Sequence, residues 1–98
     1  MKLNWNVKLN MPILILNPGE NIIGKITGSV PHELLGVPVT VWRVQQSNRT
    51  IGLVANDPAL SLQLSEFTGV HVNVEVSSQM TDDCTVVKRY NIKETGIL

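Results

Sequence analysis

The chain has 98 residues, and its eight lysine and arginine side chains balance eight aspartate and glutamate side chains. This length is too short for two ordinary domains, so we expect one domain with one core. The zero net charge excludes the strong overall field of a basic nucleic-acid-binding protein, although it leaves room for a local basic patch. Hydrophobic residues make up 43% and aromatic residues only 4%, an aliphatic composition that favours strands.

The N-terminal residues give the clearest strand pattern. Residues 3–9 alternate between apolar and polar side chains, the period of a half-buried strand. The apolar positions are Leu3, Trp5, Val7 and Leu9. Pro12 interrupts the next apolar run, residues 11–16, and proline suits a sheet edge or a strand start because it cannot donate to a ladder.

A turn and a short strand are predicted next. Residues 17–21 contain the Asn, Pro and Gly that are typical of a turn, and residues 22–27 form a short apolar strand. Gly28 and Pro31 would disfavour a helix, and we expect the chain to change direction at residues 28–31.

The middle of the chain predicts a hairpin followed by a helix. Residues 37–44 alternate and residues 50–55 form a second strand, joined by a polar loop. Asp57 is a capping residue before Pro58, and apolar side chains then recur at helical spacing. The predicted helix is about residues 58–68.

The C-terminal part predicts two further strands. Residues 70–76 alternate valine with polar side chains, and residues 77–83 read as a polar loop. Residues 84–92 form a less regular strand, and residues 93–98 are expected to be a loose tail. The side chains expected to point inward from the last strand are Cys84, Val86, Tyr90 and Ile92.

Compartment and cofactors follow from what the sequence lacks. Cys84 is the sole cysteine, so it cannot form an internal disulfide or supply a structural zinc site by itself. The first ten residues contain no continuous signal-peptide core. No later apolar run approaches the roughly 20 residues that a membrane helix needs. We expect a cytoplasmic protein with no membrane contact, no metal and no cofactor.

No motif assembles a catalytic set. Residues 19–26 have the glycine spacing of a phosphate-binding loop, but Ile26 stands where that loop needs Ser or Thr. His71 and Glu75 on one strand face would lie about 13 Å apart, too far to share an ion. Asp82 and Asp83 next to Cys84 are acidic, whereas an activated thiol needs a basic neighbour, so a nucleophilic role is disfavoured. We expect no enzymatic activity.

Five residues could serve nucleic-acid binding. A small barrel can bring a ring and cations together as a surface that stacks bases and holds phosphates. The competing interpretation is a core tryptophan with ordinary surface charges. The five residues are Trp42, Arg43, Arg49, Lys88 and Arg89.

A family resemblance bears on this alternative. Residues 37–76 contain a strand, a second strand with Ile51 and Gly52, a short helix and a closing valine strand. This order resembles the second half of a HIRAN domain, a small β-barrel found alongside helicases that holds DNA ends. That family usually carries an Asn-Pro-x-Asp run between the strands, whereas residues 45–49 read Gln-Gln-Ser-Asn-Arg. The resemblance implies DNA binding.

These patterns predict a mainly-β, single-domain barrel or sandwich of about six or seven strands with one short helix. The leading functional hypothesis is a non-catalytic binding or assembly module, and the alternative is a nucleic-acid-binding barrel. The partner is expected to be a second copy or another protein. A homodimer is the simplest form, with the contact at Leu3, Trp5, Val7 and Leu9 or at residues 11–16, because a poorly protected sheet edge is a template for pairing.

Overall fold

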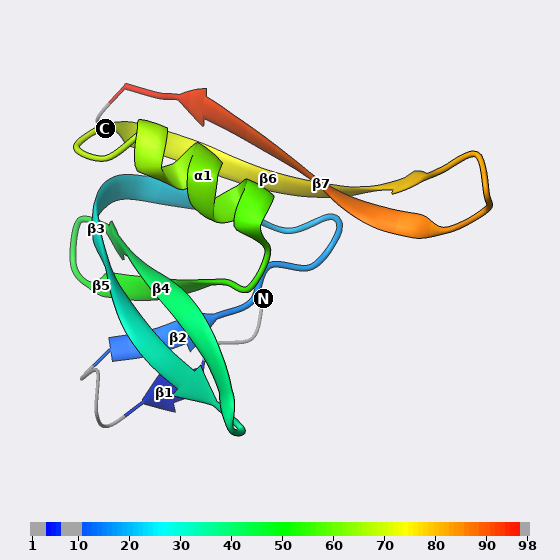
Figure 1. The fold of residues 1–98 in the computed structure, drawn as a ribbon. Helices are drawn as coiled ribbons and strands as arrows, with labels where there is room; N and C mark the ends of the chain where they lie inside the picture. Colours follow the sequence, from blue (N-terminus) through cyan, green and yellow to red (C-terminus); the bar gives the residue numbers. More distant parts are fainter. Residues whose placement is uncertain (1–3, 7–10, 97–98) are drawn as a thin grey trace.

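The computed structural model describes residues 4–6 and 11–96, within which seven strands form one sheet accompanied by one helix (Figure 1). The strand order is β1-β2-β5-β4-β3-β6-β7. The elements are β1 (Asn4–Asn6), β2 (Met11–Leu14), β3 (Asn21–Leu34), β4 (Val37–Gln45), β5 (Thr50–Ala55), α1 (Pro58–Glu66), β6 (His71–Met80) and β7 (Val86–Glu94).

The mainly-β class with one short helix is confirmed, but a closed barrel is not. β1 and β7 form opposite edges of the sheet, so the sheet is open. Neighbouring strands are antiparallel except β2 and β5, which run parallel with Ile13 opposite Gly52. Pro12 is the second residue of β2, at the strand start that the sequence suggested.

The expected change of direction at residues 28–31 is wrong. β3 continues through this segment to Leu34. Its register against β4 shifts at Gly28, and the φ of Gly28 is 146°. Glycine adopts this backbone conformation without steric cost, so a bulge replaces a turn. Pro31 is tolerated because β3 pairs with β6 only up to Lys25, which leaves one side of its later part unpaired.

The hairpin of β4 and β5 and the helix agree with the sequence. Asp57 caps α1, and its Oδ1 accepts a hydrogen bond from the Ala59 amide at 2.9 Å. Pro58 begins the helix, where its missing N–H leaves no helical bond unmade. The helix ends two residues earlier than predicted, and Gly69 has the positive φ of 86° expected after a helix end.

The C-terminal strands are longer than the sequence indicated. The predicted loop at residues 77–83 is wrong because β6 continues to Met80, opposite Val86 of β7. β7 runs to Glu94, which pairs with Val72, so Lys93 and Glu94 belong to a strand and not to the loose tail predicted for residues 93–98. Cys84 points outward in the turn, and Val86 is exposed, whereas Tyr90 and Ile92 pack against the core as expected.

Two apolar clusters lie on opposite faces of the sheet. Leu60 and Leu64 of α1 pack with side chains from β2 to β7 in the main core. Adjacent residues of β4 diverge, because Trp42 joins this core while Val41 joins a smaller cluster on the other face. The smaller cluster consists of Met11, Ile13, Val41 and Val54.

Candidate assembly surfaces

Beyond the core, β6 and β7 continue as a two-stranded ribbon that projects past α1 (Figure 1). We call residues 77–89 the β6–β7 arm. β3 pairs with β6 only from His71 to Glu75, so the arm has no third strand. An isolated two-stranded ribbon is marginally stable in water, so such a segment gains from a partner.

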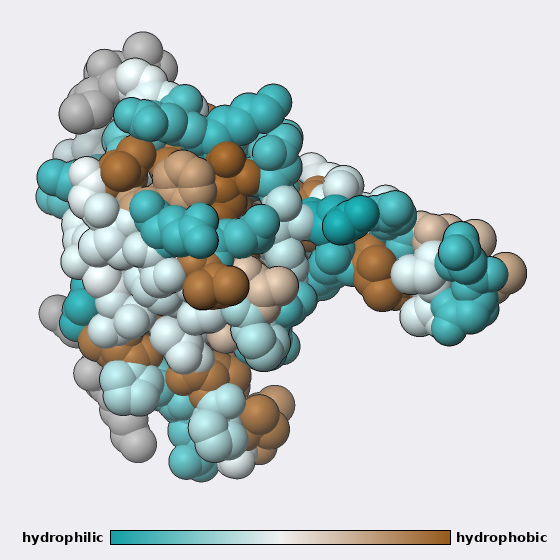
Figure 2. Space-filling model, turned by 45° about the horizontal axis from the view of Figure 1, so that its top comes forward, coloured by the Kyte–Doolittle hydropathy of each residue, from teal (hydrophilic) through white to brown (hydrophobic). Residues whose placement is uncertain are grey.

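One face of the arm carries an unpartnered apolar pair. Successive strand residues alternate between faces, so Met80 continues the face of the buried Val76, and Val86 continues that of Tyr90. Met80 and Val86 lie directly opposite each other and are 65% and 62% exposed. The inner face of the arm therefore ends in an exposed apolar pair, which Ser78 and Lys88 separate from the core. Figure 2 shows apolar surface on this projection, at the right of the view.

The turn of the arm is held by its own hydrogen bonds. Thr81 Oγ1 donates to Asp83 Oδ1, and the Thr81 amide donates to the Thr85 carbonyl at 2.8 Å. The Thr81 and Thr85 hydrogen bonds hold the pKa of Asp83 below its ordinary value. Cys84 in this turn has a φ of 64°.

Charged side chains of opposite sign lie at the two ends of the arm. Asp82 and Asp83 lie in the turn, whereas Lys88 and Arg89 lie where the arm leaves the core. Lys88 Nζ donates to the Leu16 carbonyl at 2.8 Å, which ties the base of the arm to the segment after β2. Arg89 Nε donates to Gln79 Oε1 on the outer face.

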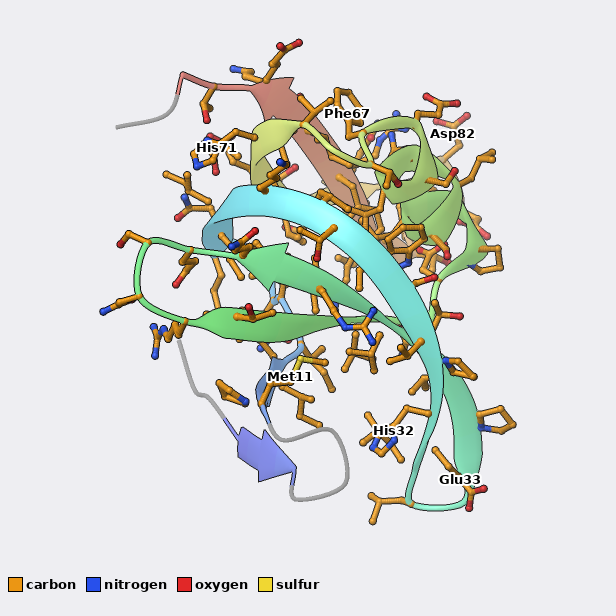
Figure 3. All side chains as sticks on the ribbon, turned by 90° about the vertical axis from the view of Figure 1, so that its left-hand side faces the viewer. Met11, His32, Glu33, Phe67, His71 and Asp82 are labelled. Carbon is orange, nitrogen blue, oxygen red and sulfur yellow. The ribbon has the colours of Figure 1, made fainter. Side chains whose placement is uncertain are left out.

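The hairpin of β3 and β4 forms a second projection. His32 and Glu33 mark the end of β3 near its turn in Figure 3. We call residues 34–37 the β3–β4 tip. Leu35 and Gly36 form its turn with φ values of 51° and 81°, and the Leu35 side chain is 104% exposed. Val37 beside it is also exposed.

A groove of about 680 Å³ lies between α1 and the hairpin of β3 and β4. We call it the α1 groove. Its lining includes Pro38, Val39, Trp42, Pro58 and Leu62, and no ionisable side chain among the described residues lines it. Trp42 is buried, and its indole Nε1 donates to Ser61 Oγ at 3.2 Å, which fixes the ring against the helix. The groove is apolar with a few hydroxyl groups.

The structure spreads the five residues considered for nucleic-acid binding. Trp42 and Arg43 are adjacent on β4 and point to opposite faces, and the buried Trp42 ring offers no free stacking face. Arg49 is exposed in the loop between β4 and β5, where its Nε donates to Gln46 Oε1 at 3.3 Å. Lys88 and Arg89 lie on β7, with β3 and β6 between them and β4. The geometry does not gather these five side chains into one surface.

The N-terminal contact expected from the sequence is largely beyond the described residues. Leu3, Val7 and Leu9 lie outside them. Trp5 belongs to β1, which pairs with β2 and forms one edge of the sheet. Sequence reasoning missed the arm because residues 77–79 are polar, although Met80 and the Val86–Val87 pair flank the turn on both sides.

Within residues 4–6 and 11–96, no group of three His, Cys, Asp or Glu side chains could hold a metal ion. His71 Nδ1 lies 2.8 Å from Thr95 Oγ1 beside a hollow of about 520 Å³. The same described ranges contain no helix that is long and apolar enough to cross a membrane.

Comparison of the chain with protein-family models, with curated proteins and with solved structures finds no match. The resemblance of residues 37–76 to a HIRAN domain therefore gains no support from these comparisons. The functional proposal depends on the geometry of this chain.

Proposed function

We propose that this chain is a non-catalytic assembly module that binds a second copy of itself through the inner face of the β6–β7 arm. The observation that carries the proposal is the cross-strand pair of Met80 and Val86, which extends the core face into solvent. Large apolar side chains on a ribbon without a third strand are stabilised when a partner covers them.

The magnitudes suit a contact between two protein surfaces. Burying an exposed Met or Val side chain contributes about 1.5–3 kcal/mol. In a symmetric contact the same side chain is buried in both copies, so its contribution counts twice.

Charge favours a second copy as the partner. Two arms that lie antiparallel about a two-fold axis place the tip of each arm beside the base of the other. Asp82 and Asp83 of one copy then approach Lys88 of its partner, which lies on the same inner face as Val86, while the apolar pairs meet beside this contact. The zero net charge removes long-range repulsion between copies.

Two double variants on opposite faces of the arm test this proposal. Met80→Thr with Val86→Thr removes the inner apolar pair, and Gln79→Thr with Val87→Thr alters the pair directly beside it on the outer face. Sedimentation velocity should show that the dimer dissociation constant rises by more than about tenfold for the inner variant and changes little for the outer one. Equal effects of both variants, or no effect of either, would refute an inner-face contact.

A further inference from the structure

Leu35 breaks two local preferences at once. Its φ of 51° lies in the left-handed region, which is costly for a branched apolar residue and is tolerated by Asn and Gly. A two-residue hairpin turn with two positive φ values normally has Asn-Gly in place of Leu-Gly. Its side chain also stands fully in solvent. Asn would suit both the conformation and the exposure, so a leucine here needs another reason, and such exceptions gather at functional positions.

The α1 groove has the chemistry that an exposed leucine needs. It is lined by proline, valine, tryptophan and leucine side chains, with no ionisable side chain from the described residues. Residues 34–37 of the β3–β4 tip are likewise uncharged. The other projecting turn carries Asp82 and Asp83, and burying two carboxylates in this groove would be unfavourable. The β3–β4 tip is therefore the better occupant of the two.

The tip cannot enter the groove of its own chain. β3 and β4 remain paired up to Leu34 and Val37, so only two residues form the turn. Pro38 and Val39 of the same hairpin line the groove, which leaves no slack for the tip to fold back.

We infer that the α1 groove of one copy receives Leu35 at the β3–β4 tip of a second copy. This inference rests on the proposed self-assembly and adds a second contact to it. The β3–β4 tip and the β6–β7 arm project in different directions (Figure 1), so the two contacts use separate surfaces. When two dimers exchange tips and grooves reciprocally, the assembly closes as a tetramer.

Two single variants separate the tip from the groove. Leu35→Asn removes the apolar tip and relieves its backbone strain, so its thermal unfolding midpoint should equal or exceed that of the wild type. Leu62→Glu places a charge at the exposed rim of the groove without disturbing the core. Leu35→Met keeps an apolar side chain of similar volume and serves as the matched control.

Light scattering at increasing protein concentration gives the readout. Wild type and Leu35→Met should reach tetramers, whereas Leu35→Asn and Leu62→Glu should each stop at dimers, with tetramer affinity reduced about tenfold or more. A mixture of Leu35→Asn and Leu62→Glu retains one intact tip and one intact groove. It should recover heavier species that neither variant forms alone.

Four outcomes overturn the inference. Tetramers of Leu35→Asn as stable as those of the wild type would exclude the tip, and a mixture that stays dimeric would exclude the groove as its receptor. A wild type that stops at a dimer, weakened by Met80→Thr with Val86→Thr but not by Leu35→Asn, would remove the tip contact and leave the arm contact standing. A wild type that stays monomeric would remove the proposed function as well, so the two failures are distinguishable.

Discussion

At Gly24 the backbone of β3 passes very close to β4. A Cβ atom there would lie 2.6 Å from Val44 Cγ1 and 2.8 Å from the Gln45 carbonyl oxygen, which belongs to the backbone and cannot rotate away. We expect Gly24→Ala to lower the free energy of unfolding by about 1–3 kcal/mol through overpacking.

Urea denaturation measures this change, with Gly96→Ala as the control because a Cβ atom at Gly96 meets nothing within 4 Å. The control should change stability by less than about 0.5 kcal/mol. A Gly24 variant as stable as its control would show that β3 and β4 are less closely packed than described.

Tyr90 provides a pH signal from the contact between β7 and the start of α1. Burial, the charge of Asp57 and a hydrogen bond with that carboxylate raise the pKa of Tyr90 above its ordinary value of 10.0. The unfolded chain ionises first, so the stability contribution is complete below pH 10 and is lost as the pH rises through the raised pKa.

Ultraviolet titration of phenolate can follow this group alone because the chain has one tyrosine. The midpoint should lie above pH 10 in the wild type and move down in Asp57→Asn. A midpoint at or below the ordinary value would contradict the placement of Tyr90 beside Asp57.

At the level of elements, the β6–β7 arm should be the least protected part of the long strands. Its hydrogen bonds join two strands only, with no core beneath Met80 or Val86. In hydrogen exchange at low protein concentration, amides of residues 77–89 should exchange faster than those of residues 72–76.

The same amides should gain protection as the concentration rises and copies cover the arm. Residues 46–49, in the loop between β4 and β5, serve as an internal control whose exchange should not depend on concentration. Protection of the arm that is high and constant at all concentrations would mean that the arm needs no partner.

The elements predicted from sequence are those with a local signal. β4 and β5 are short apolar runs joined by a polar loop, and α1 carries a cap at Asp57 and a proline at its start. The continuation of β3 was missed because glycine at 28 supports a bulge as readily as a turn. The arm was missed because both faces of residues 77–79 are exposed, so the period-two pattern disappears there.

The candidate surfaces are formed by contacts that no local sequence pattern predicts. Trp42 looked like a candidate for stacking, but α1 covers it, and only the fold brings Ser61 within hydrogen-bond distance of its indole. Leu35 carried a weak signal, since a Leu-Gly pair in a two-residue turn is unusual. That signal could be used only after the turn had been placed at residues 35–36.

For the whole molecule, the sequence predicts that strands dominate, but it does not predict whether the sheet closes into a barrel. Alternation shows that a strand has one buried face, yet it does not show which strands form the edges of the sheet. The parallel pairing of β2 with β5 links segments far apart in sequence and leaves β1 as one edge, with β7 as the other. The open sheet and its two projecting hairpins are consistent with a chain that is completed by other copies.

Self-assembly through the inner face of the β6–β7 arm predicts a concentration-dependent dimer. Sedimentation of the wild type and the inner-face variant, from about 1 to about 100 μM, measures it, because this range spans the dissociation constants expected of a modest interface. We predict a reversible rise from monomer to dimer for the wild type, shifted to higher concentration by Met80→Thr with Val86→Thr. A wild type that remains a monomer throughout this range would contradict the claim.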